Sequence, residues 1–181
     1  MKRRLFTGAL LVTPWLAKAQ TEPLVASLRA GACAVLLRHA ITDPGIGDPP
    51  GLRLDQCSSQ RNLSAEGRAQ SARIGQWFNQ HSLRPAEVRS SAWCRCKDTA
   101  ELAFSRYSVW PALNSFFGMA DTREPQTAQL RAALVRIPAG QFEVWVTHQV
   151  NMTALTGEGM AMGEALLVNA RGKMVTRHTF G

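Results

Sequence analysis

Two histidines and two arginines stand where apolar segments of the chain end. Arg38 and His39 close the run "AVLL", His148 closes the segment "VWVT", and Arg95 lies just beyond a third short apolar segment. Guanidinium groups match phosphate oxygens in pairs and stay charged at any working pH. A neutral imidazole can attack phosphorus while neighbouring groups hold the transferring phosphoryl group. Brought together, these four residues would form a phosphate site; taken singly, each could equally cap a strand or lie satisfied in the core.

The hydrophobic pattern predicts strands that alternate with helices. Ser64 is a good N-cap for the first long helix, and Pro23 suits the first turn of an earlier, shorter one. Residues 170–172 join the last two strands as a hairpin. The predicted strands are 33–38, 88–90, 109–113, 142–147, 165–169 and 173–177, and the predicted helices are 22–30, 65–80, 92–104, 126–136 and 150–155.

This order of elements predicts an α/β fold. We expect a three-layer domain with a mostly parallel central sheet flanked by helices and a C-terminal β-hairpin. In such sheets, ligands bind where the carboxyl ends of the strands meet. Arg38, His39, Arg95 and His148 should therefore lie at one edge of the sheet, where the helix after Ser91 could add amide donors.

The first 19 residues have the pattern of a cleaved signal peptide. A basic start (Lys2-Arg3-Arg4) precedes a short apolar run (residues 5–16) and a small-x-small site (Ala17-Lys18-Ala19). The run contains Pro14 and is shorter than the roughly 20 residues of a spanning helix, which disfavours an uncleaved anchor. We expect cleavage after Ala19, a single domain over residues 20–181, a periplasmic location and no stable membrane insertion after cleavage.

The charge of the chain is modest once the signal peptide is set aside. That segment carries four of the 21 Lys and Arg residues and no acid, which leaves seventeen basic against thirteen acidic side chains, or +4. No block of basic residues interleaves with aromatic ones, so nucleic-acid binding is disfavoured. A mildly basic surface suits a small anionic partner. No carboxylate cluster suggests a metal, and we expect no cofactor.

Four cysteines in an exported chain favour disulfides over metal ligands. We expect a bridge from Cys57 to Cys94 or to Cys96. The spacing of Cys94 and Cys96 is too short for the usual zinc pattern, so metal binding is the weaker interpretation.

Five segments, in order, resemble the histidine phosphatase (phosphoglycerate mutase-like) superfamily. "LLRHA" is similar to its Arg-His-Gly signature, with Ala40 in place of glycine, and "VRSSAWCRCKDTAELAF" is similar to its Ser-Ser-Pro-x-x-Arg segment. "RNLSAEGRAQSARIG", "VWVTHQVNMTALTG" and "GEALLV" resemble the first long helix, the second-histidine segment and the strand after it. The resemblance implies a phosphoglycerate mutase-like fold and a small phosphorylated substrate. It makes His39 the nucleophile, with Arg38, Arg95 and His148 around the phosphate.

Two positions depart from the pattern of that superfamily. Ser115 stands where many members carry a glutamate that acts as general acid, and Gln149 follows His148 where another branch has aspartate. Asp121 and Glu124 are the nearest alternative acids, although a loop carboxylate is more often simply solvated. Without a strong acid, phosphates with good leaving groups, such as acyl, aryl or phosphohistidine phosphates, are favoured over alkyl esters.

Three hypotheses follow from the sequence. The first is an exported, metal-independent phosphatase (a phosphoric monoester hydrolase) that forms phosphohistidine on His39, with the loop 41–60 as the roof of its pocket. The second is a phosphate-ligand binding protein of the same fold with weak catalysis, a hypothesis favoured by Ser115 in place of the glutamate. The third is a disulfide-stapled interaction module, in which Arg38 and Arg95 are dispensable for binding small ligands.

Overall fold

Six strands and five α-helices make up the described chain. The computed structural model describes residues 15–118 and 120–180. Its strands are β1 (Cys33–Arg38), β2 (Glu87–Ser90), β3 (Ser108–Val109), β4 (Phe142–Thr147), β5 (Glu164–Asn169) and β6 (Met174–Thr179). Its α-helices are α1 (Trp15–Ala30), α2 (Ala65–Gln80), α3 (Cys94–Phe104), α4 (Arg123–Leu134) and α5 (Gln149–Thr156), and short 3₁₀ turns occur at Cys57–Ser59, Pro111–Leu113 and Ala120–Thr122.

The strands form one sheet in the order β3-β2-β4-β1-β5-β6. The four strands from β3 to β1 are parallel, whereas β5 runs antiparallel to both of its neighbours, β1 and β6. This confirms the mostly parallel sheet and the C-terminal hairpin. The centre of the sheet is the pair β1–β4, with Arg38 opposite Thr147 at the end of the pairing.

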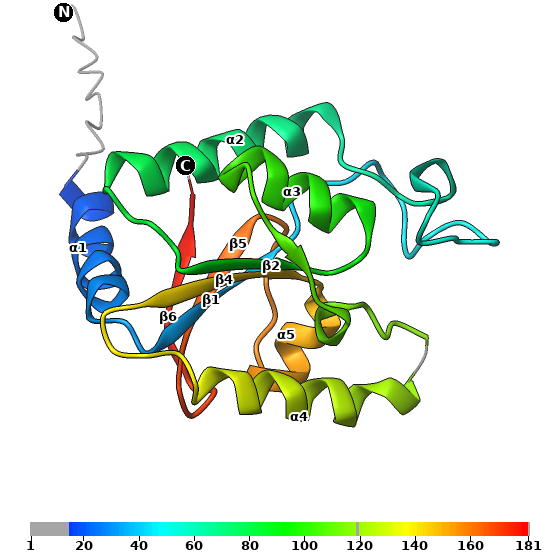
Figure 1. Cartoon of the computed structure of the whole chain (residues 1–181). Helices are drawn as coiled ribbons and strands as arrows, with labels where there is room; N and C mark the ends of the chain where they lie inside the picture. Colours follow the sequence, from blue (N-terminus) through cyan, green and yellow to red (C-terminus); the bar gives the residue numbers. More distant parts are fainter. Residues whose placement is uncertain (1–14, 119, 181) are drawn as a thin grey trace, which may run out of the picture.

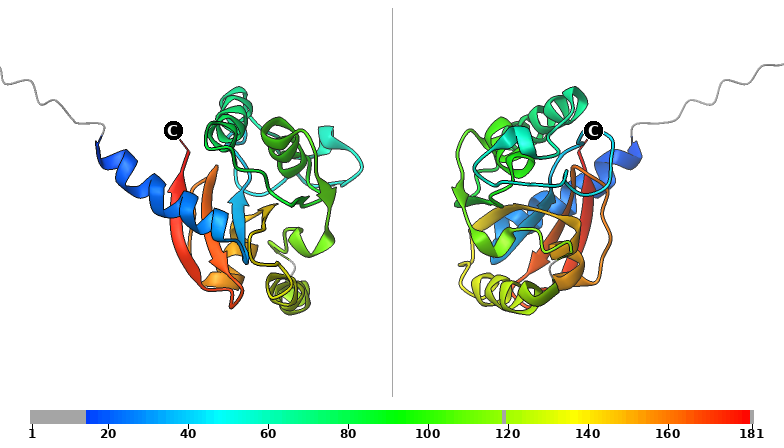
Figure 2. Two further views of the ribbon diagram at one scale, coloured as in Figure 1. Left: turned by 60° about the vertical axis from the view of Figure 1, so that its left-hand side comes forward. Right: turned by 90° about the vertical axis from the view of Figure 1, so that its right-hand side faces the viewer.

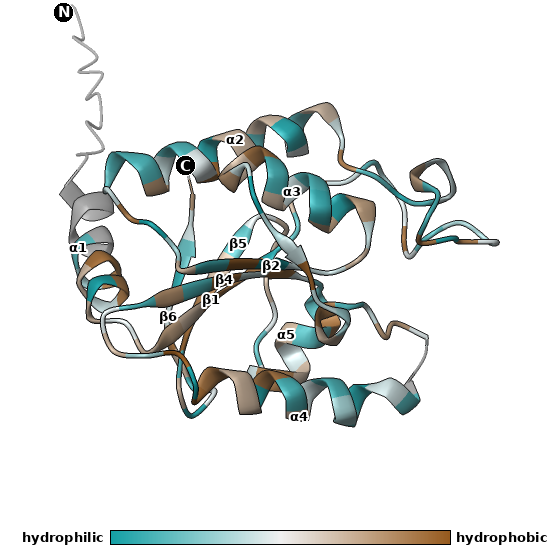
Figure 3. Cartoon of the chain, in the orientation of Figure 1, coloured by the Kyte–Doolittle hydropathy of each residue, from teal (hydrophilic) through white to brown (hydrophobic). Residues whose placement is uncertain are grey.

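Helices cover both faces of the sheet. Figure 1 shows α2 and α3 on one face and α4 and α5 on the other, and Figure 2 shows the same layers from two further directions. Successive residues of a strand point to opposite faces. Accordingly, Val35 and Leu37 join the core beneath α1, α2 and α3, whereas Leu36 joins the core beneath α4 and α5. The inner strands β1, β4 and β5 are accordingly buried along most of their length and mainly apolar, while the helices also carry many hydrophilic residues (Figure 3).

Two predicted elements differ from the structure. Helix α1 begins at Trp15 rather than at residue 22, so Pro23 lies inside the helix and not in its first turn. The predicted strand 109–113 is wrong: β3 ends at Val109, and Pro111 begins a 3₁₀ turn in which the Asn114 amide bonds the Pro111 carbonyl. Proline cannot donate to a strand ladder, whereas it suits the start of a helical turn.

The signal-peptide prediction falls mostly on residues 1–14, which lie outside the described residues. Its last residues, 15–19, lie in α1. Within the described ranges, no helix combines the length and the apolar character that a bilayer crossing requires.

Helices α2 and α3 pack closely because a glycine lies between them. The Ser64 side chain caps α2 as predicted, accepting a hydrogen bond from the Gly67 amide at 3.1 Å. Further along α2, a Cβ atom added at Gly75 would lie 3.0 Å from Cα of Ala103 and would overlap its carbonyl oxygen. The absence of a side chain at Gly75 thus sets the separation of the two helices.

Replacing Gly75 with alanine should therefore destabilise the fold. In an open helix position this change would increase stability by about 0.5–1 kcal/mol, but here it forces two backbones apart, and we expect a net loss of about 2 kcal/mol. Urea denaturation measures it. Ala69→Gly, at an exposed position of α2, calibrates helix propensity alone. A Gly75→Ala variant at least as stable as the parent would contradict the close packing.

Candidate active site

Three neighbouring strands end at the same edge of the sheet, and each delivers part of one site. The backbone amide of His39, after β1, bonds the carbonyl of Thr147 at the end of β4. The amide of Ser91, after β2, bonds the carbonyl of Val146 at 3.0 Å. These ties place the rings of His39 and His148 with their centroids 5.4 Å apart.

His39 is buried and held in one tautomer. Its Nδ1 lies 2.9 Å from the carbonyl oxygen of Ala40. A carbonyl oxygen only accepts, so Nδ1 carries the proton and Nε2 keeps its lone pair. Burial, and then the charge of Arg95, lower the pKa of His39 from 6.5 to about 3. The imidazole is thus neutral, with Nε2 available as a nucleophile.

His148 is oriented by hydrogen bonds from two sides. Its Nε2 lies 2.8 Å from Oγ of Ser91, and that hydroxyl in turn reaches Oδ1 of Asn114 at 3.3 Å. Its Nδ1 lies 3.5 Å from Nη2 of Arg95, which can only donate. Nε2 therefore donates to Ser91 and Nδ1 accepts. Burial, and then the neighbouring His39 and Arg95, hold the pKa of His148 well below its usual value.

Arg95 is buried and forms an ion pair with Asp48. Its Nη1 and Nη2 donate to the two carboxylate oxygens of Asp48 at 2.6 and 3.1 Å, and the two side chains are only 5% and 12% exposed. Asp48 also accepts from the indole of Trp93 and from the amide of Arg61, each at 3.0 Å. Burial alone would raise the pKa of Asp48, but the hydrogen bonds from Arg95 and Arg61 outweigh it and lower that pKa.

Two further arginines face the same space. Arg38 donates through Nη1 to Oε1 of Gln149 at 3.2 Å and to the carbonyl of Met160. Arg61 donates through Nη1 to Oγ1 of Thr42 and to the carbonyl of Gly45, both at 2.8 Å. Burial and the neighbouring guanidinium groups lower the pKa of both arginines.

The pocket bounded by these side chains has a volume of about 720 Å³. Among its lining residues, the charged groups are three guanidinium groups and one carboxylate, with both imidazoles neutral, so the lining carries a net charge of +2. The Nε atoms of Arg38, Arg61 and Arg95 are all buried without a hydrogen-bond partner. These three donors are enclosed by protein, so they add positive charge beside the cavity rather than open contacts within it. With three guanidinium groups and one carboxylate, the lining suits an anion of about two negative charges.

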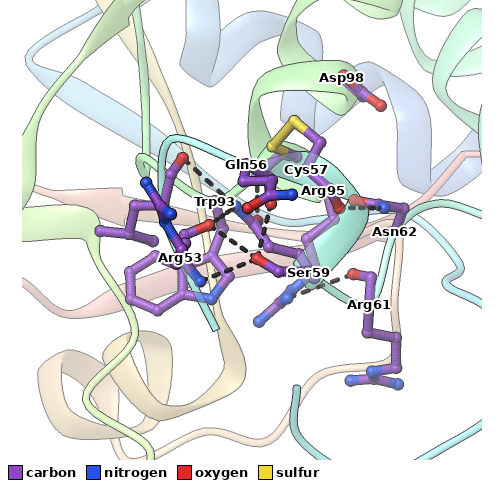
Figure 4. Close-up of a disulfide and its surroundings, with 12 residues drawn as sticks. Arg53, Gln56, Cys57, Ser59, Arg61, Asn62, Trp93, Arg95 and Asp98 are labelled. Carbon is purple, nitrogen blue, oxygen red and sulfur yellow. Dashed lines mark hydrogen bonds between the residues drawn. A yellow bond between two sulfur atoms is a disulfide. The ribbon is translucent and has the colours of Figure 1, made fainter. Parts of the chain in front are cut away.

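A disulfide ties the loop over the pocket to the start of α3. Cys57 bonds Cys94, as one of the two predicted pairings, and Cys96 is a free buried thiol. Figure 4 shows the bridge beside Arg95 and Trp93. The Gln60 side chain adds a second tie, because its Oε1 accepts from the Cys94 amide at 2.8 Å. Together these ties hold the loop that carries Asp48 against the helix that carries Arg95.

The structure brings together the four residues predicted to form the phosphate site. Arg38, His39, Arg95 and His148 all line the pocket. The predicted acids do not join them: Asp121, in the 3₁₀ turn before α4, and Glu124, in its first turn, are exposed and lie outside the lining.

Two further expectations concern the surroundings of these residues. Ser115 does line the pocket, at the position where a glutamate would be expected, and it brings no carboxylate. The amides at the start of α3 do not face an anion: those of Ala92, Trp93 and Cys94 bond side chains of Asn114, Ser91 and Gln60.

Sequence reasoning missed Asp48 and Arg61. Both belong to the loop between β1 and α2, which lacks periodicity, so nothing in the pattern shows which of its side chains turn inward. Arg61 does have a local signal, since it directly precedes the lead-in to α2, which must pass close to the end of β1. Asp48 lies between Gly47 and the Pro49-Pro50 pair, and only the folded path of the loop brings it to Arg95.

The depressed pKa of His39 should appear in the pH dependence of stability. Between about pH 6.5 and pH 3 the unfolded chain binds a proton at this position that the folded chain does not bind, so stability is lost as the pH falls. In His39→Gln, the loss of unfolding free energy between pH 7.5 and pH 4.5 should be about 2 kcal/mol smaller than in the parent. Urea denaturation at both pH values tests this, and an equal loss in the two proteins would contradict it.

Removing Asp48 should leave Arg95 as an uncompensated buried charge. We expect Asp48→Ala to lose about 3 kcal/mol of stability. Inorganic phosphate should then raise the melting temperature of this variant more than that of the parent, because the anion replaces the missing carboxylate. Asp55→Ala removes a solvent-exposed ion pair with Arg53 and serves as the control, with little change expected. Equal phosphate shifts in Asp48→Ala and the parent would contradict the assignment.

Comparison with known proteins shows a shared fold. No protein-family model and no curated protein sequence matches the chain. Among solved structures, the protein histidine phosphatase SixA complexed with tungstate is 13% identical, with a TM-score of 0.55 over 81% of this chain and 96% of that one. A proposed phosphohistidine phosphatase SixA from Agrobacterium tumefaciens is 20% identical, with a TM-score of 0.56 over 81% and 97% of the chains. A proposed alpha-ribazole-5'-P phosphatase from Escherichia coli K-12 is 18% identical, with a TM-score of 0.59 over 82% and 96%. The chain therefore has the phosphoglycerate mutase-like fold of these neighbours.

Proposed function

We propose that this protein is a histidine phosphatase that hydrolyses phosphate monoesters through a phosphohistidine on His39. The observation that carries the proposal is the convergence of three guanidinium groups and a neutral, buried imidazole on one pocket. The net charge of +2 in the lining matches a phosphomonoester dianion. Support also comes from the neighbours of like fold, which are described as phosphatases, one of them with a bound tetrahedral oxyanion.

In the proposed first step, Nε2 of His39 attacks phosphorus. The N–P bond forms as the bond from phosphorus to the ester oxygen breaks, and the leaving group takes the electron pair. Arg38, Arg61 and Arg95 stabilise the charge on the phosphoryl oxygens, because guanidinium groups in a water-poor pocket act strongly on developing charge. The Ala40 carbonyl keeps Nδ1 protonated and stabilises the charge that the imidazole gains.

In the second step, water attacks phosphorus, the N–P bond breaks, and His39 returns with its lone pair on Nε2. Overall, one ester and one water give one alcohol and inorganic phosphate. The arginines supply the positive charge that a metal ion supplies in other phosphatases. Within the described ranges, no set of three or more His, Cys, Asp or Glu side chains is placed to hold a metal ion. Because the arginines supply this positive charge, we propose that the reaction needs no metal ion.

We also propose that the protein is exported. The basic, apolar and small-residue regions of residues 1–19 support a signal peptide, and a Cys57–Cys94 disulfide suits an oxidising compartment such as the periplasm. Expression of the full chain, with fractionation and mass measurement of the mature N-terminus, tests cleavage after Ala19.

The decisive experiment is hydrolysis of p-nitrophenyl phosphate in the presence of a chelator. We expect activity in the parent protein and a loss of at least about 10³-fold in His39→Ala, because the nucleophile is removed. His81→Ala, at the end of α2 and outside the pocket lining, is the matched control and should keep its activity. Acid-labile, base-stable phosphate on the quenched parent protein would identify the phosphohistidine. Full activity in His39→Ala would refute the nucleophile.

A catalytically weak phosphate-binding protein is the alternative, favoured by one observation: Asp48, the only carboxylate in the part of the lining that the structure describes, is held as an anion by Arg95. Vanadate would then raise the melting temperature of the parent while no ester, acyl phosphate or phosphoramidate is hydrolysed. Absence of both the shift and the hydrolysis would rule out any phosphate site.

A further inference from the structure

The mouth of the pocket is apolar, in contrast to its base. The charged and imidazole side chains at the base are buried, with His39 3%, His148 4% and Arg95 4% exposed. At the rim, Ile46 is 94% exposed and Phe117 is 63% exposed. The apolar side chains of the lining include Ile46, Leu52, Trp93, Phe117, Val150 and Met162.

The two most exposed of these side chains come from segments that meet across the mouth. Ile46 belongs to the loop between β1 and α2, and Phe117 to the segment between the 3₁₀ turn 111–113 and α4. A Cβ atom placed on Gly47 would lie 3.7 Å from Cε1 of Phe117, so the two segments lie close together. Large apolar side chains exposed to water are stabilised when another apolar group covers them. Exposed apolar surface of this kind marks a place where a ligand can bind.

The size of the pocket leaves room beyond the phosphoryl group. A volume of about 720 Å³ lies within the range of pockets that enclose whole small molecules. A phosphoryl group on Nε2 of His39, among the arginines, occupies only the buried base. The rest of the substrate must then extend towards the exposed part of the lining, where Ile46 and Phe117 lie.

The residues at the bottom of the pocket also restrict which leaving groups can depart from phosphorus. Asp48 is the only carboxylate among the described lining residues, and both its oxygens already accept hydrogen bonds from Arg95, Trp93 and Arg61. It therefore has no proton to give to a departing oxygen. An unprotonated leaving group must be a weak base: a phenol such as tyrosine has a pKa of about 10, whereas the value for water is about 15.7. An aryl oxide can leave unaided, whereas an alkoxide cannot.

We propose that the mouth of the pocket binds the aromatic leaving group of a small aryl phosphate monoester, with Phe117 and Ile46 against the ring. This inference rests on the proposed phosphatase function and adds the substrate class. Two independent observations carry it: exposed apolar side chains in the lining of the anion site, and the absence of a free carboxylic acid among the described lining residues.

The test compares three substrates in the parent protein and in the rim variants Phe117→Ala and Ile46→Ser. 1-Naphthyl phosphate has an aromatic leaving group, acetyl phosphate has a small leaving group that needs no acid, and glycerol phosphate has an alkyl one. We expect kcat/KM in the order naphthyl, acetyl, glycerol. Each rim variant should lower kcat/KM for naphthyl phosphate about tenfold, mainly through KM, and leave acetyl phosphate unchanged. Val135→Ser removes an equally exposed apolar side chain outside the pocket and should change nothing.

Three results would overturn the inference while leaving the phosphatase function intact. They are glycerol phosphate turned over as well as naphthyl phosphate, a rim variant that loses acetyl phosphate activity equally, and a phosphotyrosine peptide preferred over the small ester by more than about tenfold. If no compound is hydrolysed, the proposed function fails, and phenylphosphonate and methylphosphonate then test the aromatic subsite by calorimetry. Tighter binding of phenylphosphonate, lost in Phe117→Ala, supports the subsite, and equal binding refutes it.

Discussion

The parallel pairing of β4 with β1 on one side and β2 on the other is the constraint on which the site depends. Parallel neighbours end at the same edge, so the residues that follow them in the sequence must meet. The amide of His39 bonds the last carbonyl of β4, and the amide of Ser91 bonds the one before it. These backbone hydrogen bonds fix the chain at the ends of β1, β2 and β4, and His39, the helix that carries Arg95, and His148 follow directly.

Bringing three arginines into one pocket creates an electrostatic problem that the loop between β1 and α2 partly solves. Buried guanidinium groups without counter-charge are strongly destabilising. Asp48 compensates one of them through both carboxylate oxygens, and the Cys57–Cys94 bridge and Gln60 hold its loop in place. The remaining charge is left for a ligand. A second carboxylate would have improved the resting stability and removed the affinity for a dianion.

The sequence could predict features that depend on a local pattern, such as the limits of a strand, but not contacts between residues that are distant in the chain. Strands β1 and β4 were predicted to the residue, because apolar runs that end in a charged or imidazole side chain have sharp limits. The choice between Cys94 and Cys96 needed the structure: residues two apart on a helix point in nearly opposite directions, so Cys94 meets the loop and Cys96 faces the core. Asp48 escaped prediction, since its partner is 47 residues away and a loop has no period to reveal its inward side.

The same positive charges that bind a dianion also prepare the nucleophile. Burial, together with the field of Arg95, keeps His39 neutral at any pH where a phosphate monoester is doubly ionised, so binding and nucleophilicity do not compete. His148 is fixed by other partners, because its Nε2 donates to Ser91 and its Nδ1 accepts from Arg95. Two imidazoles in the same field are thus held in defined tautomers by different neighbours: the Ala40 carbonyl fixes His39 with a free lone pair on Nε2, whereas both ring nitrogens of His148 are already engaged.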